Sequence, residues 1–463
     1  MDSPSETHNE RAKQLAKRSS DQLASFVLKL AQDVDGVDER VEAFLVSDNS
    51  QNAAQLAKRH LAAFRRSRMF YDYRRTHELT GRLDQILDLI EAAVLPADSS
   101  AAFQLIVKFL ECDGHAIESA DDSDGTVGGV FQRACGLFAR AAKNLPSMYV
   151  LPVLQRLLAA NDYGTRDHLL DGVGEFLDRT HLDAFMDETR AAIATGGDSA
   201  RRSRCHLQSI AESIQDPVVF EEATYAGREH ELPPNVAVDV ARHFLEAGRP
   251  REALEKLPPS TEGLRGFTSD YLELRVRILQ ALGDAEALRP ALWARFAHEP
   301  SRETLRELLA AEPANTRASM RDTAFAQVRV RLPPQGQAEF FAKIGELAAS
   351  ASIIVGAPDK LNGDRYDGLV PLAEQLETAY PLAASLVYRA LLDSILRRAA
   401  PKSYHHGSRY WRIIHELSGR IDDWKSLEPH LAYRERIDRE HARKTAFWRA
   451  VKQELWSAGA RAV

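Results

Sequence analysis

The chain has 463 residues, of which 44% are hydrophobic and 27% are charged, and its formal net charge is −7. This composition is that of a folded protein, and the length exceeds what one compact core usually organises. An acidic balance excludes a protein whose whole surface is built to condense on nucleic acid or anionic lipid. We therefore expect either several globular units or one continuous stack of repeats.

Three widely spaced cysteines, Cys112, Cys135 and Cys205, exclude a disulfide framework and favour a reducing compartment. The first residues are polar and acidic, without the basic start and apolar stretch of a secretory signal. No apolar run approaches the ~20 residues that cross a bilayer. We predict a cytoplasmic protein with no membrane segment, cofactor or metal.

In chain order, residues 1–20 are predicted to form a polar N-terminal tail, and residues 21–232 a first region of helical repeats. Apolar residues recur at intervals of three and four, whereas sustained alternation is hard to find, so the sequence predicts helices and no sheet. Turn residues divide this region into helices of ordinary length, at 96–98, 144–146, 161–164 and 195–198.

The most basic stretch is 58–82, where eight Lys or Arg residues and two acidic residues give a charge of +6, with aromatic residues between them. Guanidinium groups that reach phosphates, beside rings that stack on bases, would form a single-strand binding face. Alternatively, the rings anchor helices in the core and the arginine stems cover the outside. The candidate nucleic-acid face consists of Arg65, Arg66, Arg68, Tyr71, Tyr73, Arg74 and Arg75.

Acidic residues gather in the following segment, 111–124, beside Cys112 and His115. Carboxylates at a turn could hold a divalent cation. The spacing departs from the calcium-loop template, because Ala120 stands at the first ligand position and Phe131 at the last. The alternative is a solvated turn that caps a helix beginning near Thr126.

Residues 233–332 are predicted to form tetratricopeptide-like helix pairs. Segments 235–257 and 269–311 each place a glycine between two amphipathic helices. Gly283 is predicted to be a left-handed C-terminal cap, and Asp284 begins the next helix. Two short helices joined at a glycine turn are the unit that tetratricopeptide repeats stack.

Residues 333–463 are predicted to form a C-terminal helical region. Within it, 353–368 carries four Gly or Pro residues and is predicted to be the longest irregular loop. Segment 397–412 is a second basic and aromatic stretch that could extend a nucleic-acid face. His405 and His406 are expected at a helix start, pointing in different directions and therefore not serving as joint metal ligands.

Signatures of catalysis are missing from the sequence. No Gly-x-Ser-x-Gly elbow, phosphate-binding Gly-x-x-x-x-Gly-Lys-Ser/Thr loop or His-Glu-x-x-His pair occurs. We therefore predict no catalytic residue, and the sequence favours a protein that is not an enzyme.

Several short stretches together resemble an uncharacterised bacterial family, a domain of unknown function with an all-helical, tetratricopeptide-like body. The resemblance covers roughly residues 20–455, and it is carried by the order and spacing of segments 64–70, 121–127, 161–167, 380–384 and 441–448. The resemblance implies a fold and brings no activity or ligand.

The same stretches place polar residues at turns of successive helix pairs, and stacking would bring those turns to one rim. Such a rim could recognise a partner, or its residues could be helix caps that maintain the stack. The candidate partner-binding rim consists of Asp122, Asp124, Asp162, Tyr163, Arg166 and Asp167.

The sequence thus predicts an all-α protein, an α-solenoid of stacked antiparallel helix pairs of the tetratricopeptide or HEAT type. The favoured function is a non-enzymatic scaffold that binds a protein partner along this surface. One alternative is a nucleic-acid-binding module that uses 58–82 and 397–412. The other is a metal-dependent enzyme that uses the acidic turns of 111–124.

Overall fold

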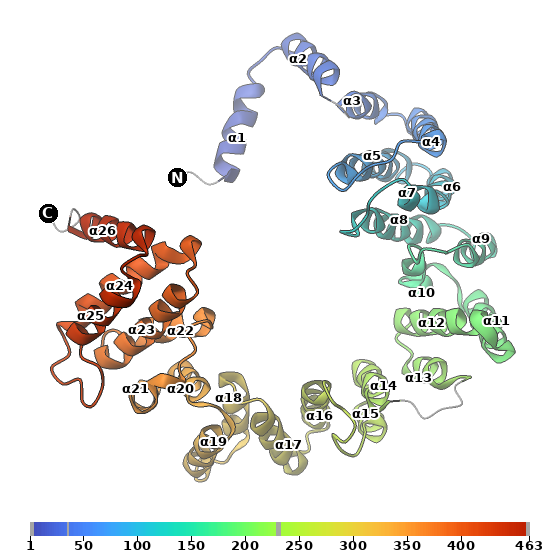
Figure 1. The fold of residues 1–463 in the computed structure, drawn as a ribbon. Coiled ribbons are helices and arrows are strands. Elements are labelled where there is room, and N and C mark those ends of the chain that lie inside the picture. The colour runs from blue at the N-terminus through green and yellow to red at the C-terminus, as the bar shows by residue number, and fades with distance from the viewer. Residues whose placement is uncertain (1–3, 35–36, 228–232, 460–463) are drawn as a thin grey trace. The chain divides into compact units, whose positions relative to one another are not determined.

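The computed structural model describes residues 4–34, 37–227 and 233–459, and every regular element in these ranges is a helix. Extended backbone pairs within them at one isolated bridge, between Tyr71 and Ala120. The predicted all-α fold is therefore confirmed. Figure 1 shows the succession of helices along the chain.

Contacts between helices divide the chain into two units, Met1–Leu257 and Pro258–Val463. The α-helices of unit 1 are α1 (Pro4–Leu15), α2 (Ser20–Asp33), α3 (Val37–Val46), α4 (Ser50–Arg66), α5 (Thr76–Leu89), α6 (Ser99–Leu110), α7 (Asp113–Glu118), α8 (Thr126–Ala142), α9 (Ser147–Ala159), α10 (Val173–Phe176), α11 (Arg179–Thr195), α12 (Gly197–Ser213), α13 (Pro217–Tyr225), α14 (Pro234–Glu246) and α15 (Pro250–Lys256). A π-helical turn, η1 (Ile90–Val94), extends α5, and a 3₁₀ turn, η2 (Asp167–Leu170), precedes α10.

Helices of unit 1 pack mainly against close neighbours in sequence, as in the succession from α11 to α15. Aromatic rings join the helices further upstream: the rings of Phe103 and Phe138 lie 4.9 Å apart, and those of Phe138 and Phe176 lie 5.8 Å apart. Because these contacts link α6, α8 and α10, one apolar core runs beneath the turns that connect the helices.

Side-chain caps fix where several helices of unit 1 begin. Asn49 accepts hydrogen bonds from the backbone N–H groups that open α4, Asp98 does so for α6, Asp178 for α11 and Asp216 for α13. Each cap satisfies donors that the first helical turn leaves without a partner. The starts of these helices are therefore encoded locally.

Unit 2 contains α16 (Thr268–Leu282), α17 (Ala285–His298), α18 (Arg302–Ala311), α19 (Arg317–Arg331), α20 (Pro334–Lys343), α21 (Leu347–Gly356), α22 (Tyr366–Leu376), α23 (Pro381–Arg397), α24 (Tyr404–Ser418), α25 (His430–His441) and α26 (Thr445–Gly459), with 3₁₀ turns η3 (Pro358–Lys360) and η4 (Pro401–Ser403). Its largest core surrounds α23, which packs against α21, α22 and α24. Tyr388, Tyr433 and Phe447 are almost completely buried there.

The predicted helix pairs of the central region are present. Segment 235–257 forms α14 and α15, and 269–311 lies within α16, α17 and α18. Gly283 ends α16 with φ of 69°, in the left-handed region, and the carboxylate of Asp284 accepts a 3.0 Å hydrogen bond from the N–H of Ala287. Both caps were expected from the sequence and are confirmed.

The expectation of a long loop at 353–368 is wrong. Helix α21 continues to Gly356 and α22 already begins at Tyr366, so the connections 257–267 and 419–429 are both longer. The connection is compact because Gly363 lies against α23, where a Cβ atom would stand 2.0 Å from the carbonyl oxygen of Ala390. Glycine here serves close packing instead of an open loop.

Candidate partner-binding surface

Two connections of unit 1, 67–75 and 119–125, pair with each other, and a third, 160–166, contacts α7, which directly precedes 119–125. The backbone of Tyr71 donates a 2.8 Å hydrogen bond to Ser119 and accepts one of 2.9 Å from Asp121. The hydroxyl of Tyr163 donates to the carboxylate of Glu118 at 2.8 Å. The structure thus brings together turns that lie about fifty residues apart in sequence.

Asp122 caps a helix. Its carboxylate accepts hydrogen bonds from the N–H groups of Val127, at 2.8 Å, and Gly128, at 3.2 Å, at the start of α8. Gly125 precedes the helix with φ of 69° and lets the chain turn back. The helix begins at Thr126, as the capping interpretation expected.

Arg166 is a core residue. Its Nε donates to Oδ2 of Asp113 at 2.8 Å, its Nη2 donates to Oδ1 at 2.5 Å, and its Nη1 donates to the carbonyl of Leu157 at 3.1 Å. The hydroxyl of Thr165 donates to the same carboxylate at 2.7 Å. These contacts bury the guanidinium group inside unit 1. Arg166 is therefore not a surface residue, and its place in the candidate partner-binding rim is corrected.

Four other rim residues, Asp124, Asp162, Tyr163 and Asp167, are exposed. Asp167 accepts a 2.6 Å hydrogen bond from the side chain of Asn161, and Asp124 accepts one of 3.3 Å from the hydroxyl of Tyr73. Hydrogen bonding to Glu118 is the main reason that the pKa of Tyr163 is raised. Asp124 and Tyr163 thus connect segments that are distant in sequence, whereas Asp167 makes a local contact.

Tyr71 is 3% exposed, and its hydroxyl accepts a 3.2 Å hydrogen bond from Nη1 of Arg82. The ring is therefore not available to stack on a base, which corrects its place in the candidate nucleic-acid face. Two of the arginines on that face are also engaged. Arg75 pairs with Glu78 at 2.9 Å, and Nε of Arg66 donates to the carbonyl of Ala62 at 2.9 Å.

The remaining arginines of the face, Arg65, Arg68 and Arg74, are exposed and form no salt bridge or side-chain hydrogen bond within the described part of the chain. Phe70 and Tyr73 lie between them in sequence and are 61% and 56% exposed. This surface therefore combines uncompensated positive charge with accessible aromatic area.

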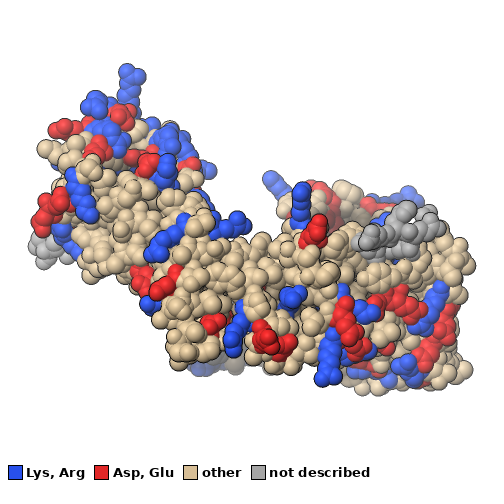
Figure 2. Space-filling model, turned by 90° about the horizontal axis from the view of Figure 1, so that it is seen from below, with Lys and Arg blue, Asp and Glu red and all other residues tan. Residues whose placement is uncertain are grey.

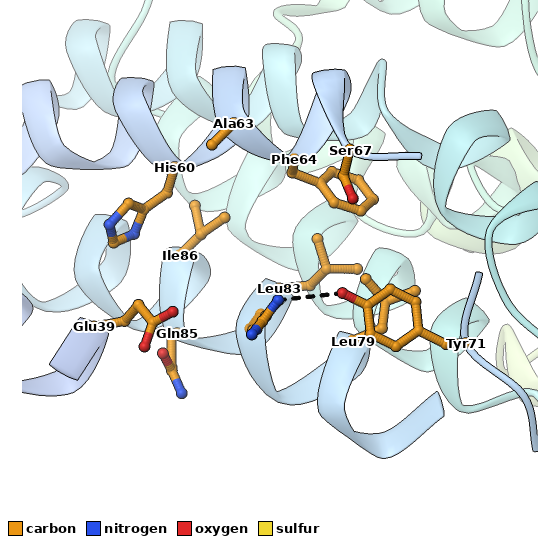
Figure 3. Close-up of a pocket in the computed structure, with 11 residues that line it drawn as sticks. Glu39, His60, Ala63, Phe64, Ser67, Tyr71, Leu79, Leu83, Gln85 and Ile86 are labelled. Atoms are coloured by element: carbon orange, nitrogen blue, oxygen red, sulfur yellow. Dashed lines mark hydrogen bonds between the residues drawn. The ribbon is translucent and has the colours of Figure 1, made fainter. Parts of the chain in front are cut away.

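A pocket of about 280 Å³ opens between α4 and α5 (Figure 3). Its apolar side is formed by Phe64, Tyr71, Leu79, Leu83 and Ile86, with Ala63 at the edge. The remaining lining residues are polar: Glu39, His60, Ser67, Arg82 and Gln85. The dashed line in Figure 3 is the hydrogen bond from Arg82 that holds the Tyr71 ring in the wall.

The walls of this pocket are held from behind. The ring of Phe64 meets that of His115 edge to face, with centroids 5.0 Å apart, and Nε2 of His115 lies 3.1 Å from the carbonyl oxygen of Phe64. Leu79 and Leu83 stand one helical turn apart on α5 and are buried. These contacts anchor the side chains that form the apolar side of the pocket.

In the second basic and aromatic segment, 397–412, the tyrosine and tryptophan rings are not accessible at the surface. Tyr404, Tyr410 and Trp411 are buried in the core of unit 2. Arg412 pairs with Glu416 and with Glu454. On the face of the molecule in Figure 2, Lys and Arg are interspersed with Asp and Glu and do not gather into one field.

His405 and His406 lie in the first turn of α24, as expected, but their rings do not diverge: the ring centroids are 3.9 Å apart. Among the described side chains, no group of three or more His, Cys, Asp or Glu is arranged to hold a metal ion. Within the described ranges, none of the helices combines the length and apolar character needed to cross a membrane.

Sequence reasoning missed the partner of Arg166 and the pocket. Asp113 was one carboxylate among several in 111–124, and no local signal distinguishes it, because its contacts come from residues about fifty positions away. The pocket residues on α5 follow an ordinary helical spacing. The pocket also needs Tyr71 and α3, which line it together with these α5 residues and whose position no local sequence signal indicates.

Residues 5–216 and 194–450 match the family of unknown function DUF6880. The chain belongs to this family. The expected resemblance to an uncharacterised family is thereby confirmed. A comparison with curated proteins finds no match. Membership of DUF6880 assigns no activity to this chain.

Proposed function

We propose that the protein is a non-enzymatic scaffold, an α-solenoid of stacked antiparallel helix pairs of the tetratricopeptide or HEAT type, that binds a protein partner in the cytoplasm. The packing of successive helices within each unit supports the stacked architecture. The observation that carries the binding proposal is the pocket between α4 and α5, whose lining residues Phe64 and Ser67 are next in sequence to Arg65 and Arg68, two exposed arginines without acidic partners in the described structure.

The partner is an acidic segment that carries one large apolar side chain. Burial of a Leu, Ile or Phe side chain against Leu79 and Leu83 contributes about 1.5–3 kcal/mol. Acidic residues on either side of that anchor pair with Arg65, Arg68 and Arg74, which raises the association rate and selects against basic partners. An apolar anchor in a preformed pocket with a charged surround is the usual pattern of an interface hot spot.

Binding of single-stranded nucleic acid is the second candidate, and the unpaired arginines and the exposed ring of Phe70 favour it. It ranks second because Tyr71 is buried and the hydroxyl of Tyr73 donates to Asp124, a carboxylate that repels phosphate. Phe70 is then the one ring of this face that is free to stack on a base, which is little aromatic area for binding single-stranded nucleic acid.

A metal-dependent reaction at the acidic turns is the third hypothesis. The carboxylates of 111–124 have other partners: Asp122 caps α8, Asp113 holds Arg166, and Glu118 accepts from Tyr163. These contacts favour a structural role for the acidic turns over a catalytic one.

The test is affinity capture from the native host with the full chain, after nuclease treatment of the lysate. We expect an acidic protein to be captured by the wild type and lost with the triple variant R65E/R68E/R74E. The matched control is R277E/R289E/R306E, which changes the charge equally at arginines of unit 2 that are exposed and unpaired within the described residues.

Capture that survives in the first variant, or is lost equally in both, contradicts the proposed site. Loss of capture on nuclease treatment alone supports the nucleic-acid alternative. In that case binding also weakens steeply with salt, because each phosphate contact releases counterions.

A further inference from the structure

The N-terminal helices of unit 1 carry an unusual amount of exposed apolar surface. Of the nineteen large hydrophobic residues that are exposed in the described chain, seven lie between residues 15 and 45: Leu15, Phe26, Val27, Leu28, Val34, Phe44 and Leu45. Phe44 is 78% exposed and Leu45 is 74% exposed. Apolar residues gathered in this way mark an interaction surface.

The exposure does not arise from a poorly formed helix. Ser19 and Gln22 form a capping box at the start of α2, in which each side chain accepts from the other's backbone N–H at 3.3 Å. On α2, Leu23, Phe26, Val27 and Leu30 follow the spacing i, i+3, i+4 and i+7, which places them on one face. This is the pattern of a helix that packs against another element.

Within the described residues this face is only partly covered, because α2 packs against α3 and leaves Leu23 and Leu30 half-buried. Neither α2 nor α3 contains a buried residue. Phe44 borders a hollow of about 570 Å³ that reaches Leu89 and Ala93 behind it. Because a helix in water gains most of its stability from packing of its apolar face, the two helices require a partner surface.

The charges around this face indicate what that partner is. Arg11, Lys13, Lys17 and Arg18 precede α2 and are exposed. Four exposed acidic residues follow on and around α2 and α3, namely Asp21, Asp33, Asp38 and Asp48, against two exposed basic residues, Lys29 and Arg40. A two-fold contact places the basic stretch of each copy against the acidic stretch of the other, so the region is complementary to itself.

We propose that α2 and α3 form a homodimer interface in which the apolar face of each copy covers that of the other. Such an interface would cover the exposed side chains of Phe26, Phe44 and Leu45, which are 55%, 78% and 74% exposed in the single chain. An anionic membrane surface fits less well, because the polar side of α2 carries Asp21 and Asp33 against the single Lys29. This inference does not depend on the proposed function, since the exposed apolar side chains of this face do not line the pocket, to which α3 contributes only Glu39.

The test is the molar mass of the full chain, measured by light scattering during size-exclusion chromatography over a dilution series. The monomer mass is 51.6 kDa, and we expect twice that value for the wild type. F26E and F44E each remove an apolar anchor that is exposed in the monomer, so the fold persists and dimer affinity falls by about 30-fold or more. V330E is the matched control, because Val330 is 85% exposed on α19, and it leaves the dimer unchanged.

A charge exchange tests the pairing itself. K17E/R18E weakens the dimer, and the addition of D21K/D33K restores it, because the opposite charges then meet again in reversed positions. A wild type that remains monomeric at every concentration overturns the proposal, as does a dimer that F26E and F44E both leave intact. Wild-type monomer that binds phosphatidylserine vesicles, and loses binding in F26E, overturns it in favour of a membrane surface.

Discussion

Arg166 and Asp113 are joined by two hydrogen bonds inside unit 1 although 53 residues separate them in sequence. Their side chains are only 6% and 5% exposed. Such a pair contributes little net stability compared with apolar residues of the same shape, but removing one partner leaves a buried charge without compensation. The connection 160–166 therefore depends on α7 for its position.

The first prediction concerns this pair. D113N is expected to lower the free energy of unfolding of unit 1 by about 3 kcal/mol, because Arg166 keeps its charge and loses its carboxylate. Urea denaturation followed by circular dichroism measures the change. E111Q is the control, since its partner Arg156 is 59% exposed, and a surface pair contributes less than about 1 kcal/mol. If D113N and E111Q lowered the free energy of unfolding equally, burial of the Arg166–Asp113 pair would have no effect on the cost of breaking it.

The second prediction concerns the cap of α8. D122A removes the acceptor of two backbone N–H groups and is expected to destabilise the protein by about 1 kcal/mol. D162A changes an exposed carboxylate without a hydrogen-bond partner in the described structure and is expected to have an effect within about 0.5 kcal/mol. Thermal unfolding compares the two, and a larger loss in D162A would refute the capping role.

The third prediction contrasts two glycines. G363A is expected to destabilise unit 2, because the new Cβ meets the backbone carbonyl of Ala390 on α23, which cannot move away as a side chain could. G136A lies within α8, exposed and with open space around the new Cβ, and is expected to stabilise the helix by about 0.5–1 kcal/mol. Melting temperatures that change in the same direction would contradict this reading.

The fourth prediction concerns pH. Burial, with the nearby charges of Arg389, His415 and Arg434, lowers the pKa of His430 from 6.5 to about 4. Between these values the unfolded chain binds a proton that the folded chain excludes, so stability is lost as the pH falls from about 6.5 towards about 4.

H430Q is expected to reduce this loss, measured as the fall in melting temperature over the same pH range. H298Q, at an exposed histidine of unit 2, is expected to leave it unchanged. If the melting temperature of wild type and of H430Q falls equally over this pH range, His430 is not the source of the lost stability.

Much of the fold could be predicted because its signals are local. The cap at Gly283, the start at Asp284 and the helix beginning at Thr126 each depend on residues within one or two turns of the chain. The contacts of Tyr71 and Arg166 could not be predicted in the same way, because they join segments about fifty residues apart. Burial of the Tyr71 ring follows from that meeting of turns and from no feature of its own segment.

The apolar face of α2 illustrates a second limit. Its spacing is the one that buried helices such as α8 also show, so the sequence predicts an amphipathic helix but not whether its apolar side is covered. The pocket is similar, since Leu79 and Leu83 alone predict a core face. What remains open at the surface is decided by how neighbouring helices pack.

The most direct test of the binding proposal is the affinity of the purified partner for two variants of α4. Ala63 lines the pocket and Ala62, its neighbour, is exposed and does not. A63W is expected to fill the pocket and weaken binding by about 30-fold or more in isothermal titration calorimetry, while A62W stays within about twofold of the wild type. Equal affinities of A63W and A62W would contradict the proposal that a partner side chain occupies this pocket.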